Sequence, residues 1–170
     1  MIYILESEER IMLNIRFAQR SDTKLIFQLI NELAAYEKLE NEVMVDEQIL
    51  EESLFDKKAA EVIIVEFDNK PIGYALFFNN FSTFLGRPGL YLEDIYIKPE
   101  YRGRGFGKKV FSFLANLALE RNYLRMDWCV LDWNKPSIEF YKSLGAKALG
   151  EWTIYRLDES ALKKISEKSG

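Results

Sequence analysis

The chain has 170 residues, of which 48% are hydrophobic and 14% aromatic, enough for the core of one domain. It contains no histidine and a single cysteine, which excludes histidine-based triads, the commonest zinc ligand sets and an internal disulfide. The net charge of -4 argues mildly against nucleic acid as a partner and for a small cation. No apolar run has the length of a membrane span and the N-terminus lacks a signal-peptide pattern, so we expect no membrane partner and a cytoplasmic protein.

The first half of the chain predicts a strand, two helices and a hairpin. Asp22 is a plausible cap for the first helix, and a second helix is expected after Asp46. Residues 1–12 are expected to be an appended extension or an extra edge strand, and residues 13–170 a single domain. The strands expected in this half, in chain order, lie over residues 13–17, 62–65 and 72–78.

The second half predicts alternating strands and helices. Cys129 lies inside one of the expected strands, so we interpret it as a small core residue and not as a nucleophile. The expected elements are, in order, a strand over 90–97, a helix from Lys108, a strand over 124–131, a short helix beginning at Pro136, a strand over 152–157 and a charged terminal helix.

A glycine-rich turn links the strand over 90–97 to the following helix. Its sequence is Arg102-Gly103-Arg104-Gly105-Phe106-Gly107. Glycines let a backbone approach a ligand closely, and the positive end of a helix favours an anion, so the turn predicts a phosphate site.

Two known phosphate sites can be tested by spacing. A dinucleotide-binding turn would need a glycine at Lys108, and a P-loop would need a glycine at Arg102 and Ser or Thr at Lys109. Neither spacing fits. Asp127, on a later apolar run, lies near the place of a ribose-binding acid, so a nicotinamide dinucleotide stays a minor alternative.

The spacing that does fit resembles the pyrophosphate signature Arg/Gln-x-x-Gly-x-Gly/Ala of the GNAT superfamily of N-acetyltransferases. The order of expected elements is also that of the GNAT fold, from about Leu13 to Asp158. Four further motifs are similar to those of the diamine and polyamine N-acetyltransferase group: Glu32-Leu33-Ala34-Ala35-Tyr36-Glu37, Tyr91-Leu92-Glu93-Asp94, Trp133-Asn134-Lys135-Pro136-Ser137 and Phe140-Tyr141-Lys142-x-x-Gly145-Ala146.

The resemblance implies an α/β (α+β) fold with a mixed central sheet flanked by helices. It implies acetyl-CoA as cosubstrate, no metal, a small cationic amine as acceptor and a homodimer. A lysine-like amine has a pKa of about 10.4, so its proton must be removed before attack. In the resembling group, the position of Glu93 is linked to proton removal through water, and that of Tyr141 to protonation of the leaving sulfur. We expect direct attack by the amine, since no histidine could activate Cys129.

Asp94 is the second candidate for the base. Neighbours in a strand point to opposite faces, so Glu93 and Asp94 are not expected to share one face. The resemblance also assigns two larger sets of residues. The cofactor set is Ile95, Tyr96, Ile97, Arg102, Gly103, Arg104, Gly105, Phe106, Gly107, Lys108, Asn134, Ser137 and Phe140, and the acceptor set is Tyr36, Glu37, Glu93, Asp94, Glu151 and Trp152.

Within the cofactor set, backbone N–H groups near Tyr96 and Ile97 would polarise the thioester carbonyl, at a bulge that this fold typically has there. Asn134 resembles a residue that contacts the pantetheine arm, and a helix cap explains it equally well.

The loop over residues 79–86 departs from the polyamine pattern. It has Ser82 and Phe84 where the polyamine enzymes carry an acid and a tryptophan. This weakens spermidine as the acceptor and leaves a shorter amine or a thialysine-like amino acid. Two alternative functions stay open: a non-catalytic CoA-binding regulatory module, and, with less support, a dinucleotide-dependent oxidoreductase.

Overall fold

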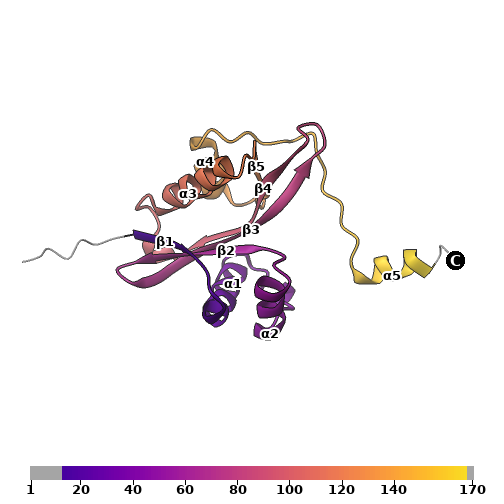
Figure 1. Cartoon of the computed structure of the whole chain (residues 1–170), viewed down its shortest axis with the longest axis horizontal. Coiled ribbons are helices and arrows are strands. Elements are labelled where there is room, and N and C mark those ends of the chain that lie inside the picture. The colour runs from indigo at the N-terminus through magenta and orange to yellow at the C-terminus, as the bar shows by residue number, and fades with distance from the viewer. Residues whose placement is uncertain (1–12, 168–170) are drawn as a thin grey trace, which may run out of the picture. The chain divides into compact units, whose positions relative to one another are not determined.

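The structure is a computed structural model and describes residues 13–167, so the expected extension over residues 1–12 lies outside the described residues (Figure 1). The strands are β1 (Leu13–Phe17), β2 (Glu61–Phe67), β3 (Lys70–Ser82), β4 (Arg87–Ile97) and β5 (Met126–Trp128). The α-helices are α1 (Thr23–Glu37), α2 (Glu47–Glu51), α3 (Phe106–Glu120), α4 (Lys135–Ser143) and α5 (Glu159–Glu167). Four short helical turns join them, namely η1 (Arg20–Asp22), η2 (Glu40–Glu42), the π-helical η3 (Glu52–Asp56) and η4 (Pro99–Tyr101).

The chain divides into two compact units at Cys129. The first unit, up to Cys129, contains all of the described strands together with α1, α2 and α3. The second unit begins at Val130 and contains α4 and α5. The single domain expected over residues 13–170 therefore stays a prediction.

The first unit is built around a mixed sheet in the order β1-β2-β3-β4-β5. The pairs from β1 to β4 are antiparallel, whereas β4 and β5 run parallel and are connected through α3, as a parallel pair requires a crossover. The hairpin between β2 and β3 turns at Asp68 and Asn69, whose φ angles are 51° and 56°. Positive φ at both central residues is typical of tight hairpin turns, so the expected hairpin is confirmed.

Helices cover both faces of this sheet (Figure 1). On one face, α1 and α2 pack on a buried cluster that includes Ile26 of α1, Leu50 of α2 and Tyr74 of β3. On the other face lies α3, whose Val110 and Leu114 are fully buried. Residues of β2 alternate between these two faces, and for this reason all four central residues of the strand are buried.

Two expected strands differ from the structure. The strand expected over 124–131 shortens to β5, because only Met126 to Trp128 pair with β4. The strand expected over 152–157 is wrong for the described chain. The segment has no strand pairing, and its apolar side chains Trp152 and Ile154 are exposed. A strand needs a neighbour to accept its backbone hydrogen bonds, and none of the described strands pairs with this segment.

The two acidic residues expected at helix starts, Asp22 and Asp46, have different roles. Helix α2 follows Asp46 as expected, and the Asp46 side chain caps it by accepting a hydrogen bond from the Ile49 N–H at 2.8 Å. Asp22 precedes α1 but makes no side-chain cap. Its carboxylate instead accepts hydrogen bonds from the Arg16 guanidinium at 2.7 Å and 2.9 Å, and this contact lowers the pKa of Asp22. A nearby cation therefore binds the carboxylate in preference to the helix end.

Candidate active site

A β-bulge in β4 positions the two candidate bases. Phe77 pairs with Leu92 and the preceding residue, Leu76, pairs with Asp94, so Glu93 is an extra residue without a cross-strand partner. Leu76 packs against the cluster under α1 and α2, which places Asp94 on that face. Glu93 follows Leu92, which shares the opposite face with Phe77, so Glu93 also points toward the α1 and α2 face. The prediction that Glu93 and Asp94 point to opposite faces is therefore wrong.

Beyond the bulge, β4 separates from β5. Pairing with β5 ends at Leu92 opposite Trp128, whereas pairing with β3 continues to Ile97. The Lys98 N–H donates to the Ile72 carbonyl of β3 at 2.8 Å, so by alternation the N–H groups of Ile95 and Ile97 point away from β3. These N–H groups face the side where β5 has ended.

The expected position of the bulge was wrong, because it lies at Glu93 and not near Tyr96. The N–H group of Ile97 points away from β3, the orientation that it needs to polarise a carbonyl on the side where β5 has ended. Tyr96 does not, since by the same alternation its N–H points toward β3.

Acidic side chains gather on the α1 and α2 face of the bulge. Asp94 accepts a hydrogen bond from the Tyr74 hydroxyl at 2.9 Å, and burial raises the pKa of Asp94. Burial and the charge of Asp94 also raise the pKa of Glu37, at the end of α1. Glu93 is exposed beside them. Partly buried carboxylates with raised pKa values are relieved either by protonation or by a nearby cation, so an ammonium group is a ligand that this face could accommodate.

The glycine turn forms an open cradle at the start of α3. Gly103 and Gly105 have φ of 75° and 78°, and Gly105 is the residue that precedes the helix. A Cβ placed on either glycine would meet no atom within 4 Å, so the space above the turn is free. The first N–H groups of a helix have no partner within the helix, and Arg104 and Lys108 are exposed beside them. The cradle therefore fits an anion such as a pyrophosphate.

The Arg102 side chain points toward α1 and the end of β4, although its motif suggests a contact with phosphate at the start of α3. Its guanidinium carbon is 4.3 Å from the ring centroid of Tyr36 and 5.5 Å from that of Tyr96. Its Nε donates to the Ile97 carbonyl at 2.7 Å. The side chain is thus held among rings near the acidic face, and its contact with phosphate stays a prediction.

The second unit carries the remaining candidate residues. Asn134 is buried and caps α4, accepting a hydrogen bond from the Ser137 N–H at 3.4 Å. The rings of Phe140 and Tyr141 follow each other on α4, with centroids 5.6 Å apart. Glu151 and Trp152 lie in the irregular segment after α4, and both are exposed. The cap is one contact of Asn134, and the contact of Asn134 with the pantetheine arm and the catalytic role of Tyr141 stay predictions.

Cys129 differs from its expected environment. The cysteine follows the end of β5 and is exposed, so the prediction of a buried strand residue is wrong. Its Sγ lies 3.2 Å from the Tyr91 hydroxyl, and this contact raises the pKa of Tyr91 to about 12. Burial of the thiol therefore gives no support to direct attack, whereas the absence of histidine from the chain still does.

Tyr74 was missed by the sequence analysis. It is fully buried in β3, and an aromatic residue in an apolar strand predicts only a core position.

Asp127, the acid suggested as a ribose-binding residue of a dinucleotide site, binds other side chains. Its carboxylate accepts a hydrogen bond from Asn80 Nδ2 at 2.9 Å and lies 2.9 Å from Arg125 Nε. Across residues 13–167 no three acidic, cysteine or histidine side chains are grouped to hold a metal, and no described helix is long and apolar enough to cross a membrane.

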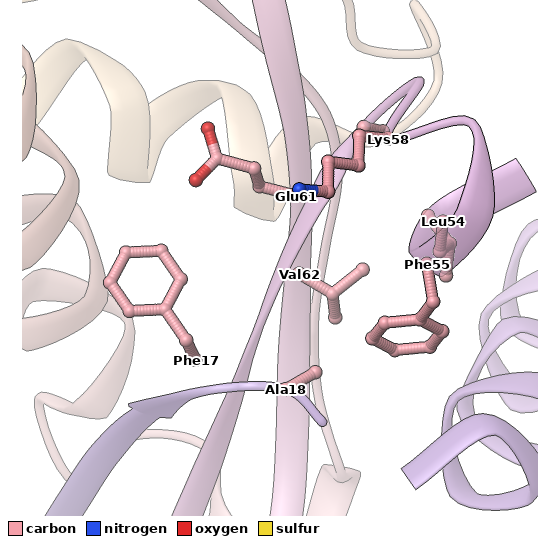
Figure 2. Close-up of a pocket in the computed structure, with 8 residues that line it drawn as sticks. Phe17, Ala18, Leu54, Phe55, Lys58, Glu61 and Val62 are labelled. Carbon is pink, nitrogen blue, oxygen red and sulfur yellow. The ribbon is translucent and has the colours of Figure 1, made fainter. Parts of the chain in front are cut away.

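A separate cavity of about 400 Å³ lies between β1, η3 and β2. Figure 2 shows the rings of Phe17 and Phe55 on either side of Val62, with Lys58 and Glu61 nearby. The Glu61 carboxylate is already bound by Arg121, with one contact of 2.8 Å. None of the candidate site residues lines this cavity, and most of its lining residues are apolar.

The relatives found by comparison with known proteins are acetyltransferases. The chain is 37% identical to the thialysine N-epsilon-acetyltransferase of Bos taurus over 91% of this chain and 97% of that protein. It is 28% identical to the L-ornithine N5-acetyltransferase of Arabidopsis thaliana, over 93% and 90% respectively. A crystal structure of a predicted acetyltransferase with acetyl-CoA from Clostridium acetobutylicum superposes with a TM-score of 0.69 at 23% identity, covering 86% of this chain and 97% of that one.

The family comparison agrees with the fold. The model of the acetyltransferase (GNAT) family matches residues 26–146, which include the bulge, the cradle and α4. The expected mixed sheet flanked by helices is confirmed. Because the match spans more than half of the sequence, the chain belongs to the GNAT family of acetyltransferases.

Proposed function

We propose that the protein transfers an acetyl group from acetyl-CoA to the side-chain amine of a small amino acid or diamine, of about the length of lysine or ornithine. The observation that carries this proposal is the acidic face of the bulge, where Glu37, Glu93 and Asp94 gather and where no cation is among the causes of the pKa shifts of Glu37 and Asp94. Relatives that act on thialysine and ornithine support an aminoalkyl amino acid as the acceptor.

The cradle supports acetyl-CoA as the donor. Backbone N–H groups from Gly103 to Lys108 would hold its pyrophosphate, and the exposed Arg104 and Lys108 would add charge. Acetyl-CoA supplies an activated thioester when it is bound. The Ile97 N–H, which points to the side where β5 has ended, would then hydrogen-bond to the acetyl carbonyl.

Proton transfer in this proposal uses carboxylates. An acceptor ammonium among Glu37, Glu93 and Asp94 would pass its proton to the exposed Glu93, directly or through water, before the amine attacks the thioester carbon. Tyr141 would donate a hydrogen bond to the sulfur as it leaves. Full transfer from a phenol to a thiolate is uphill, since their ordinary pKa values are about 10 and about 8.5, so its effect is stabilisation of developing charge.

The loop between β3 and β4 limits the length of the acceptor. Ser82 is buried, and its Oγ accepts a hydrogen bond from the Leu85 N–H at 3.2 Å, so it serves the turn. Phe84 is 96% exposed. The loop thus offers no carboxylate to a second ammonium, which a long polyamine would require.

An acceptor panel tests the proposed function. Thiol release from acetyl-CoA should give the highest kcat/KM with lysine, thialysine or ornithine and a value at least about tenfold lower with spermidine, the scale of one missing charge contact. Glu93→Gln should lower kcat/KM by about two to four orders of magnitude, whereas Glu120→Gln, an exposed change on α3, should not. Spermidine as the best acceptor would contradict the length assignment. No release with any amine, with acetyl-CoA still bound, would favour the regulatory module.

Replacement of a cradle glycine tests the donor. Acetyl-CoA should raise the melting temperature of the wild type more than NAD does, because a ligand that binds the native state stabilises it. Gly105→Val should lose this shift, since its side chain would enter the space above the turn. Gly86→Val is the matched control, because Gly86 has a similar φ of 63° and open surroundings outside the cradle. Retention of the full shift in Gly105→Val would contradict the assignment.

Removal of one phenol tests the general acid. Tyr141→Phe should lower kcat by about one to three orders of magnitude while the KM for acetyl-CoA changes little, as expected for a group that acts at the transition state. Tyr155→Phe removes a phenol that is 90% exposed in the same unit and should leave kcat unchanged. Equal kcat values for wild type and Tyr141→Phe would leave Tyr141 as a packing residue.

We also propose a homodimer in the cytoplasm. The dimer is supported by the segment over 152–157, which was expected to form a strand and which exposes Trp152 and Ile154, two residues apart. A second copy would give these side chains an apolar partner. Sedimentation equilibrium should therefore give the mass of two chains, and Ile154→Lys should shift it toward one. A single-chain mass for the wild type would contradict the dimer, and cell fractionation would test the location.

A further inference from the structure

The buried hydroxyl of Tyr74 is bound to a carboxylate of the acidic face. Tyr74 is fully buried on β3 in the cluster that contains Ile26 and Leu29 of α1. Its hydroxyl donates to Asp94 Oδ2 at 2.9 Å. Burial of a phenol in apolar surroundings is costly unless its hydroxyl finds a partner, and here the ring is fixed by packing. The direction of the hydrogen bond to Asp94 is therefore fixed as well.

Only one oxygen of Asp94 is used in this way. Within residues 13–167, Asp94 Oδ1 accepts no hydrogen bond, yet it is not among the buried polar atoms that lack a partner. The oxygen is therefore accessible to solvent or to a ligand. Tyr74 approaches from the core side, so the accessible oxygen is the one that a ligand on the surface would meet.

The charged and titratable groups that face Asp94 come from three elements. They are Glu93 on β4, Glu37 on α1 and Tyr74 on β3, and the next side chain on the same face of β4 is Tyr96. Burial, Tyr74 and Glu93 are the causes that shift the pKa of Asp94, and no cation of the described residues is among them. The guanidinium of Arg102 lies on the rings of Tyr36 and Tyr96 beside this face, but it is not among the groups that shift the pKa of Asp94. A cation in contact with the accessible oxygen of Asp94 would therefore come from the ligand.

We propose that Tyr74 is a positioning residue of the acceptor site, which holds one oxygen of Asp94 so that the other receives the acceptor's ammonium group. The proposal rests on the proposed function and adds a residue to it. Asp94 then binds the ammonium, and the exposed Glu93 receives the proton from that nitrogen before attack. The bulge is what allows this division, since it brings both carboxylates to one face.

The expected effect of removing the hydroxyl has a definite sign. Burial raises the pKa of Asp94, and the hydrogen bond from Tyr74 lowers it, because a donor stabilises the carboxylate. Without the hydroxyl the pKa of Asp94 rises further. Asp94 is then protonated at acidic pH and cannot bind the ammonium, whereas at alkaline pH it is ionised with or without Tyr74.

The test is Tyr74→Phe, with kcat/KM for the best amine measured from about pH 5 to about pH 9. We expect a loss of about tenfold at the acidic end, the scale of a hydrogen bond to a charged group, which shrinks toward the alkaline end. The loss should appear in the KM for the amine and not in that for acetyl-CoA. Tyr123→Phe is the matched control, because it removes a hydroxyl from another buried tyrosine, one that contacts Arg121.

A double-mutant cycle separates positioning from packing. If Tyr74 acts through Asp94, Tyr74→Phe should cause no further loss in an Asp94→Asn background. A loss that is constant across pH, or one that persists in that background, would overturn the proposal. Titration of the Asp94 carboxyl by carbon NMR in the ligand-free protein gives a readout that needs no turnover. An unchanged titration in Tyr74→Phe overturns the inference, whereas a wild type inactive on every amine overturns only the proposed function.

Discussion

The bulge at Glu93 is the constraint on which the candidate site depends. A regular strand would send Glu93 and Asp94 to opposite faces of the sheet. The extra residue shifts the alternation by one, so both carboxylates meet Glu37 of α1 on one face. The bulge at Glu93 directly follows Leu92, the last residue of β4 that pairs with β5. The carboxylates of Glu93 and Asp94 therefore lie on the acidic face, and the N–H groups of Ile95 and Ile97 that follow them point away from β3. In the proposed function, this short stretch of β4 would serve both the acceptor and the donor.

The acidic face is maintained at an energetic cost that the fold offsets locally. Partly buried carboxylates repel one another and lose hydration, and both effects raise the pKa values of Glu37 and Asp94. Tyr74 offsets part of this cost with one hydrogen bond from the core. An ammonium ligand would offset more, because it brings the missing opposite charge. This electrostatic cost is the physical reason why the proposed acceptor is a cation.

The arginine and glycine motif has two structural roles. Its glycines give the backbone its left-handed turn, with φ of 75° at Gly103 and 78° at Gly105. Its first arginine instead lies on the rings of Tyr36 and Tyr96 and binds the Ile97 carbonyl. The side chain thereby links α1 to the end of β4. A charged residue in a phosphate motif can thus serve packing, since a guanidinium is planar and stacks well on aromatic rings.

The sequence by itself determined the features that depend on neighbouring residues: the hairpin at Asp68, the start of a helix after Asp46 and the glycine turn before α3. Each of these is set by local backbone preferences. The shared face of Glu93 and Asp94, the bond from Tyr74 and the exposure of Cys129 were decided only in the tertiary structure. The physical reason is that strand register is fixed by pairing between distant segments. The inserted residue is Glu93, which lies between the partners of Leu76 and Phe77. It redirects every side chain of β4 that follows, and no local pattern in the sequence of β4 indicates it.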